Sequence, residues 1–459
     1  MLNDEQLEIV SKALMPLFDE LEVTVIADIA RRVRKTMTYT RTAELMAMEM
    51  RRLGYSPNRI RTETLKVLKA TPEYMKEVEK NTLEYKKEVK KLIADIVEKA
   101  RLAGDEIVAN SGEMSWIDDM RVWESGGIKL TDDSFLPQLV KAIQKQVGDG
   151  ILNLSQSTGF RGIYGFESIE KMYARTLNNA VMEISAGNFS ADVSVRKAIK
   201  ELSQSGLRSI DYESGRSIQL DNAVKLAVRT GCAQLSGKMT DENITRTKQN
   251  LVQVSSHWGA RNKGEGVENH KEWQGKVYYI EKEHDLSDEA KRIGQESITD
   301  LWEGTGYSVD EKHPNNPLGL YGYNCRHRLY PFFEGISEPI KFPPEPDPKK
   351  VDGRELDYYA QTQKMRQMER KVRNLKRERE ALRMYGAKQE EIFEMNQKIE
   401  SATDQYKEFC SQIGKKPSAP NLRYEVGTSD LHKTKAYKDY LKTKEEGLRN
   451  SETPSTLKE

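Results

Sequence analysis

The feature that most limits the folds open to this chain is a long stretch of helical spacing that follows Thr71-Pro72. Thr71-Pro72 is a typical helix start, because proline suits the first helical position. From there to Ala109 the apolar residues recur every three or four positions, and most of the others are Lys or Glu. A helix of this length would be roughly 55 Å long. It could be one amphipathic member of a bundle, or it could protrude and dock on a neighbouring protein. The apolar positions are Met75, Val78, Tyr85, Val89, Leu92, Ile96 and Ala103.

Other helices are predicted on both sides of this stretch. Apolar spacing indicates helices around 18–33, 45–53, 139–151, 169–184, 193–205 and 217–231. Gly54 stands where a helix cap is wanted, and Ser56-Pro57 reads as the start of the next helix. Residues 110–134, with Gly126-Gly127, are expected to form a loop. Residues 231–249 are expected to continue helically with little core. Before the helix at 217–231, Tyr212 and Arg216 could belong to a polar site, although such residues more often cap a helix.

Composition narrows the class of protein. A chain of 459 residues is expected to form two to four units. Its 73 Lys and Arg nearly balance 72 Asp and Glu, so no overall field attracts nucleic acid or an acidic membrane. The three cysteines lie far apart, which favours a reducing compartment over a disulfide framework. No signal peptide or membrane-spanning segment is expected.

Residues 255–335 form a distinct, compact segment. It holds five of the six histidines and three of the five tryptophans. Residues 273–280 read as a turn into a strand, residues 287–302 as a helix that Ser287 caps, and residues 320–332 as a final strand. On that strand Cys325 and His327 would face the same way, because side chains alternate along a strand.

Three interpretations of this segment remain open. His257, His270, Cys325 and His327 could supply nitrogen and sulfur ligands suited to zinc, although their spacing is not that of a zinc finger. Cys325 with a histidine could instead act as a nucleophile. The imidazoles could also be structural, each hydrogen-bonded inside a small glycine-rich fold.

The C-terminal part reads as a linker and two helices. Prolines between 339 and 348 indicate a stiff linker. Two apolar seams follow, and their phase breaks after Gly386, so we expect an antiparallel helical hairpin or a coiled coil with a fault there. The Lys/Arg-rich outer face at 370–383 could touch DNA or simply be solvated. Residues beyond 417 are polar, and the last dozen are expected to be disordered. The seams are Met365, Met368, Val372, Leu375 and Leu382, then Ile392, Met395, Ile399, Ala402, Tyr406, Phe409 and Ile413.

Three ordered motifs resemble the phage minor capsid protein 2 family, which is distantly similar to Mu-F-like minor head proteins. They are YESGRSIQLDNAVKLAVRTG, then HWGAR with HKEWQGKVY, and GLYGYNCRHRLYPFFEGIS, and together they cover about 206–339. The Mu-F-like relatives end in an NCRC-like pattern, whose second cysteine is His327 here. The structural residues of these motifs are Arg261, Trp273, Gly275, Asn324 and Arg326, with Tyr212 and Arg216 upstream.

The resemblance implies a structural, non-enzymatic minor capsid protein of a tailed phage or prophage, near the portal vertex. It would act in head assembly and in DNA packaging or ejection, bound to the portal and other head proteins, in several copies per virion after assembly in the host cytoplasm. A metal-dependent enzyme centred on Cys325 and His327, with zinc as its cofactor, is one alternative. An internal head protein that contacts packaged DNA is the other, and no membrane contact is expected.

The expected fold is mainly α with a small α+β domain: a helical N-terminal half, a compact Mu-F-like domain and a C-terminal coiled-coil hairpin. The expected division is an N-terminal helical, portal-docking region at 1–135, a helical middle at 136–254, the Mu-F-like domain at 255–337, a Pro-rich linker at 338–352, coiled-coil helices at 353–415 and a polar, partly disordered tail at 416–459.

Overall fold

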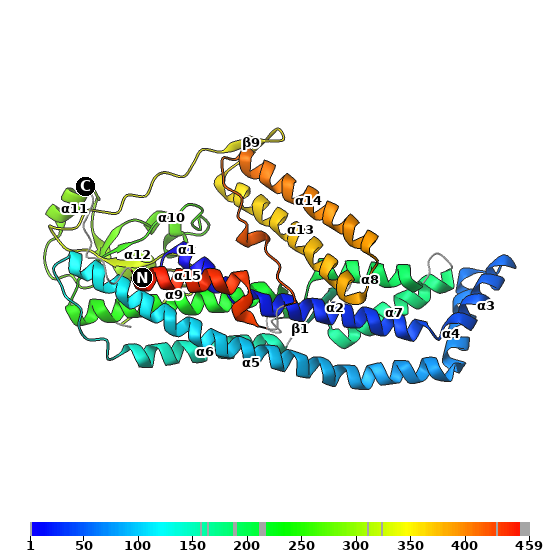
Figure 1. Cartoon of the computed structure of the whole chain (residues 1–459). Helices are drawn as coiled ribbons and strands as arrows, with labels where there is room; N and C mark the ends of the chain where they lie inside the picture. Colours follow the sequence, from blue (N-terminus) through cyan, green and yellow to red (C-terminus); the bar gives the residue numbers. More distant parts are fainter. Residues whose placement is uncertain are drawn as a thin grey trace.

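A single long helix forms the spine of the molecule. The computed structural model describes residues 2–156, 158–162, 165–186, 191–210, 217–309, 312–322, 325–427 and 430–449. It is mainly helical with small sheets, as expected (Figure 1). The spine is α5 (Pro72–Ser125), which has 54 residues and is about 80 Å long at 1.5 Å per residue. It begins at the expected signal but ends 16 residues after Ala109.

The prediction of a loop at 110–134 is therefore wrong for residues 110–125. Residues 110–125 are helical, and the chain leaves the helix only at Gly126. Small residues in this stretch serve close packing: a Cβ added at Gly112 would lie 2.9 Å from Val140 and 3.4 Å from Leu235. Glycine and serine here allow neighbouring helices to approach, and that benefit outweighs their low helix propensity.

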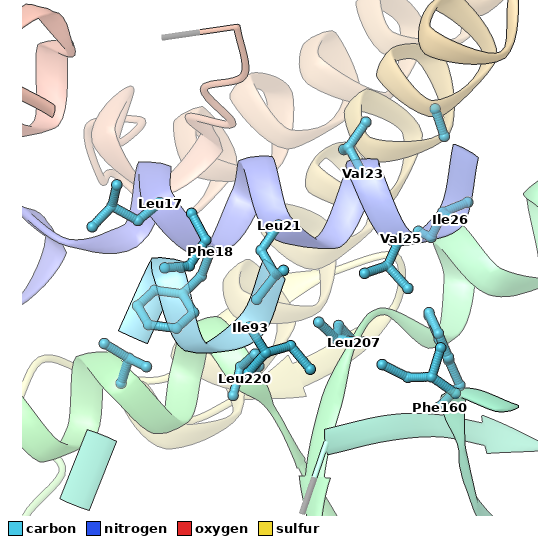
Figure 2. Packing of buried hydrophobic residues seen from close by; sticks show 14 of the residues in the cluster. Leu17, Phe18, Leu21, Val23, Val25, Ile26, Ile93, Phe160, Leu207 and Leu220 are labelled. Carbon is cyan, nitrogen blue, oxygen red and sulfur yellow. The ribbon is translucent and has the colours of Figure 1, made fainter. Parts of the chain in front are cut away.

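Three helices pack along α5 and build the main core: α2 (Met15–Met37), α6 (Leu136–Gln156) and α9 (Leu220–Thr247). The first helix, α1 (Asp4–Lys12), packs on α9. Figure 2 shows apolar side chains of α2, among them Phe18 and Leu21, directed toward Ile93 of α5 and Leu220 of α9. Burial of these apolar side chains is the main source of stability for the helices, because isolated helices are only marginally stable in water.

The helices α3 (Arg41–Arg52) and α4 (Pro57–Ala70) lie at one end of the molecule, against α7 (Ile169–Ala186), with α8 (Ala191–Ser205) beside α2 (Figure 1). Gly54, between α3 and α4, has φ +78°, as its expected capping role requires. The sequence predicted these helices, but it did not predict that some of their apolar side chains would be exposed. Leu45, Met48 and Leu53 lie largely in solvent.

The middle region was expected to be helical throughout, and it is not. It contains an antiparallel sheet in the order β2-β1-β3-β4, from β1 (Thr158–Gly162), β2 (Gly165–Ser168), β3 (Arg208–Ile210) and β4 (Ser217–Gln219). The helix expected at 217–231 thus begins only at Leu220, and it runs on to Thr247. Its second half was expected to have little core, yet Cys232, Leu235 and Met239 are fully buried.

Residues 251–340 form a small α+β unit at the end of the molecule opposite α3 and α4 (Figure 1). Its sheet has the order β7-β6-β5-β8, in which β5 pairs antiparallel with β6 and β8, and β6 pairs parallel with β7. Its elements are β5 (Leu251–Val254), η1 (Gly266–Glu268), α10 (His270–Trp273), β6 (Val277–Tyr279), α11 (Ser287–Ile293), β7 (Thr299–Asp300), α12 (Leu301–Thr305) and β8 (Leu329–Pro331).

Two elements expected in this unit are shorter than predicted. The helix at 287–302 stops at Ile293, because Gly294 takes φ +71° and ends α11, and the chain then forms β7 before α12. The final strand expected at 320–332 is only β8. Cys325 and His327 therefore precede the strand and do not lie on it.

A helical hairpin follows the proline-rich segment, which has no regular structure from 338 to 348. It begins with β9 (Lys349–Val351) and β10 (Arg354–Leu356), joined by Asp352 and Gly353 with φ of 49° and 76°, as a two-residue hairpin turn prefers. The hairpin helices α13 (Tyr358–Tyr385) and α14 (Gln389–Gln412) pack on each other and turn at Gly386, φ +92°. The phase break in the apolar seams thus predicted a fold-back at the right residue.

The basic face expected on α13 is only in part an outer face: Arg370, Lys371 and Arg383 are exposed, but two central arginines are internal. Arg373 is mostly buried and pairs with Asp19 of α2 and Asp221 of α9. Arg377 is 1% exposed and pairs with Glu22. Because these guanidinium groups are internal, they attach the hairpin to the helical body and are not available to DNA.

The region expected to be a polar tail adds to the core. After η2 (Pro420–Leu422) and η3 (Leu431–Lys433), α15 (Lys435–Arg449) packs on α1 and α5 and buries Tyr437 and Tyr440 completely. Of the last dozen residues, which were expected to be disordered, the two at 448–449 are helical and the ten at 450–459 lie outside the described residues. One buried cluster joins α2, α5, α9, the hairpin and α15, and the division into domains stays a prediction. No helix among the described residues is long and apolar enough to cross a membrane.

Candidate metal centre

The α+β unit brings three of the four predicted metal ligands together. One ring nitrogen each of His270 and His327 and the Sγ of Cys325 lie within 4.8 Å of one another. His327 Nδ1 is 3.5 Å from Cys325 Sγ. Tetrahedral zinc binds nitrogen at about 2.0–2.1 Å and sulfur at about 2.3 Å, so only a small contraction would bring these atoms to ligand distance. The donor set therefore fits zinc chemistry.

Local structure explains why these side chains meet. His270 begins α10, whose last residue leads into the turn at Gln274-Gly275 and then into β6. Gly275 takes φ +78°, and a Cβ there would lie 2.5 Å from Ser256 Oγ, so only glycine fits this turn. The Gly275 amide donates to Val254 O at 3.0 Å, which places α10 beside the start of the segment that holds His257.

Each of the two imidazoles is oriented by a hydrogen bond from its far nitrogen. His270 Nε2 lies 2.7 Å from Leu318 O, and His327 Nε2 lies 3.0 Å from Gln274 Oε1. Gln274 Oε1 also accepts from the amide of His257 at 3.0 Å, which fixes it as the amide oxygen. Since both acceptors are oxygens that only accept, each Nε2 must donate its proton, and each Nδ1 keeps its lone pair. Metal-binding histidines are typically held in this way.

His257 is adjacent to the centre but outside the three-donor group. Its ring stacks on His327 with centroids 4.4 Å apart, and its Nδ1 lies 3.1 Å from Trp258 O. Trp273 packs against both ligand rings, at 4.5 Å from His270 and 4.7 Å from His327. Its indole N–H donates to Val267 O at 2.9 Å. Trp273 and His257 thus restrict the two imidazoles to one orientation.

The electrostatics of the site favour neutral donors. Burial lowers the pKa of His270, and burial together with His257 and His270 holds the pKa of His327 well below its ordinary value. Burial raises the pKa of the Cys325 thiol to about 11. Neutral imidazoles are the form that binds metal. A thiol with a raised pKa is a poor nucleophile, and for the same reason it must lose its proton before it can bind a metal ion.

The other predicted motif residues do not all lie at this site. Arg261 donates to Leu318 O at 3.2 Å, the same oxygen that orients His270. Arg326 is exposed. Asn324, Tyr212 and Arg216 lie outside the described residues. Sequence reasoning missed Gln274 and the Leu318 carbonyl, and no pattern identifies them, because their role depends on the fold of distant segments.

Comparison with known proteins identifies the family of this chain. A family model described as phage minor capsid protein 2 matches residues 2–411. The chain belongs to this family. No curated protein and no solved structure matches it. Membership confirms the resemblance seen in the sequence and gives the chain a structural role in the phage head, as part of the virion and in association with other head proteins.

Proposed function

We propose that this minor capsid protein is an architectural component at the portal vertex and docks on the portal protein through the α3–α4 end. In this position it would act in head assembly and in the passage of DNA, without catalysis of its own. The observation that carries the proposal is a group of exposed apolar side chains at that end, here called the apolar tip: Leu45, Met48, Leu53 and Tyr55.

The apolar tip is unusual because its large apolar side chains are exposed, although α3 and α4 already pack on the rest of the molecule. Leu45 and Met48 are three residues apart on α3, so they share a face, and they are 51% and 58% exposed. Leu53, just after α3, is 59% exposed. The buried face of α3 holds only Ala43 and Ala47. Helix α3 therefore buries its small apolar side chains and exposes its large ones. This pattern is expected of an interface, because exposed apolar patches mark sites of protein contact.

The position of the tip fits an attachment point. It lies at the end of α5 opposite the α+β unit (Figure 1). A contact there would attach the molecule to the portal by one end, with its long axis extending away from the portal. A family of head proteins supplies the class of partner. The portal is the member of that class to which we assign the contact.

Replacing Leu45, Met48 and Leu53 together by glutamine is expected to reduce incorporation into heads at least tenfold. The expected change in melting temperature is small, since these side chains are already in solvent. The measurement is quantitation of the protein in purified particles, with co-purification of co-expressed portal protein as a second readout. The matched control changes two other exposed leucines, Leu102 and Leu226. Normal incorporation and portal binding of the triple variant would contradict the docking assignment.

The metal centre is proposed as a structural site. Zinc held by His270, Cys325 and His327 would tie α10 to the segment before β8 and so stabilise the α+β unit. All three donors line the same cleft, so a fourth ligand would come from there. At a zinc concentration one hundred times its Kd, binding would stabilise the folded protein by about 2.7 kcal/mol.

Cys325→Ala and His327→Ala are each expected to weaken zinc binding by at least tenfold and to abolish the rise in melting temperature that zinc causes. Zinc content of the purified full-length protein and a competition titration with a chelator measure the effect. His284→Ala is the control, because that histidine belongs to the same unit but pairs with Glu334 at the surface. Zinc absent from the wild-type protein, or bound by both site variants as tightly as by the wild type, would refute a metal site here.

A further inference from the structure

A cleft of about 1650 Å³ separates the α+β unit from the helical hairpin and has a strongly biased charge. The whole chain carries a formal charge of only +1. Among the described residues that line the cleft, however, thirteen are Lys or Arg and six are Asp or Glu. A concave wall with one sign of charge concentrates its field, so the cleft attracts anions although the protein as a whole does not.

Part of this positive charge is used within the protein. Glu8 neutralises a group that includes Lys12 and Lys225, and Asp221 pairs with Arg373. Five other lining cations form no ion pair within the described part of the chain, and they come from both sides of the cleft. They are Lys263, Arg326, Arg366, Arg370 and Lys415.

Several of these cations gather around Tyr358 at the base of α13. Lys415 Nζ lies 3.7 Å above the Tyr358 ring, and Trp258 of the α+β unit meets the same ring edge-on with centroids 5.5 Å apart. Burial lowers the pKa of Arg366, and the charge of Arg326 across the cleft lowers it further. Two guanidinium groups that repel each other in this way would be stabilised by an anion that bridges them.

An aromatic platform lies beside these cations. Tyr359, the second residue of α13, lines the cleft and is 61% exposed. Its phenol is close enough to Arg366 to influence the pKa of that arginine. Backbone-binding cations next to an exposed aromatic ring are the combination with which proteins hold single-stranded nucleic acid, because phosphates bind the cations and a base stacks on the ring.

We propose that this cleft binds a single strand of nucleic acid, with phosphates between Arg326 and Arg366 and a base stacked on Tyr359. The strand would contact the α+β unit on one side and the hairpin on the other. This differs from the DNA contact expected from the α13 sequence, because Arg373 and Arg377 are engaged internally, whereas Arg326 comes from a different unit.

The test is fluorescence anisotropy of the full-length protein with a labelled single-stranded DNA and with the matching duplex, over a range of salt. We expect the single strand to bind more tightly than the duplex. The double variant R326Q/R366Q is expected to lose at least tenfold in affinity, and its log Kd against log salt should be shallower by about 1.4, the value for two lost phosphate contacts on a single strand. Tyr359→Ala should weaken the single strand about tenfold and leave any duplex binding unchanged.

The charge-matched control is R354Q/K364Q, which removes two exposed cations of the hairpin that do not line the cleft. An equal loss in this control would show general charge attraction and overturn the site. No binding of a single strand by the wild-type protein, or tighter binding of the duplex, would also overturn the proposal. All variants alter exposed side chains, and their melting temperatures report that folding is intact.

Discussion

Replacing Arg377 by alanine is expected to lower the free energy of unfolding by roughly 3–5 kcal/mol, the cost of removing one partner of a buried ion pair. Arg377 is 1% exposed, and its Nε donates to Glu22 of α2. Its Nη1 donates to Ser203 O at 2.7 Å and to Asn374 Oδ1 at 2.8 Å. One side chain therefore joins α13 to both α2 and α8.

The cost arises mainly from the carboxylate left behind. Burial raises the pKa of Glu22, and the charge of Arg377 is the main effect that opposes this rise. Burial alone would lower the pKa of Arg377, but Glu22, Tyr424 and Asp221 together outweigh it and raise that pKa above the ordinary value. Glu22 also accepts from the amide of Leu207 and from Tyr424 OH, so the charged pair has several hydrogen bonds to satisfy it. Without the guanidinium, Glu22 must be buried unpaired or take up a proton.

Urea unfolding of the full-length protein at pH 7 measures this effect. Arg383→Ala is the control, since Arg383 pairs with Glu380 at the surface and should change stability by less than about 1 kcal/mol. The double change Glu22→Leu with Arg377→Met should recover most of the loss, because an apolar pair needs no charge compensation. A loss below 1 kcal/mol in Arg377→Ala would contradict the role assigned to the pair.

The helical hairpin that carries Arg377 also shows what the sequence could predict. The apolar seam of its second helix, α14, was predicted residue by residue, and all seven of its members are buried, because apolar periodicity reports burial directly. Arg377 gave no such signal. A charged residue on a helix is read as exposed, and its burial depends on a carboxylate 355 positions away in the sequence. Tertiary partners of this kind are invisible to local pattern.

The strands and the loops show a second limit. The sheet β2-β1-β3-β4 was missed because its strands have three to five residues and two of them follow long helical segments. The end of α5 was missed because residues 110–134 as a whole read as a loop, whereas Gly112 within them is a contact point with α6 and α9. In both cases packing decided against the local preference.

The metal centre could be predicted as a set of residue types but not as a geometry. His270, Cys325 and His327 do converge, although the reason given for Cys325 and His327, a shared strand face, was wrong. His257 lies beside them as a stacking partner. The oxygens that orient the rings come from a backbone carbonyl and a glutamine with no sequence signature, and only the fold brings them to the site.

Replacing Asp241 by asparagine is expected to stabilise the protein at pH 8 by as much as about 4 kcal/mol. Asp241 lies on α9 and is buried. Tyr307 OH donates to its Oδ2, while its Oδ1 has no hydrogen-bond partner among the described residues. Burial raises the pKa of Asp241 from 3.8 to about 7, and Asp119 nearby opposes ionisation as well. Asparagine has the same shape and carries no charge to bury.

The pH dependence distinguishes this effect from ordinary repacking. Because the folded-state pKa of Asp241 is the higher one, the folded protein binds more protons than the unfolded chain between pH 3.8 and about 7. Stability from this group is therefore greatest below pH 4, falls as the pH rises to 7 and is constant above. The difference between Asp241→Asn and wild type should follow the same curve, near zero at pH 4 and maximal at pH 8. Urea midpoints across this range measure it, with Asp288→Asn at the fully exposed Asp288 as control. A difference independent of pH would show that Asp241 is ionised in the folded protein at all these pH values, with its charge compensated.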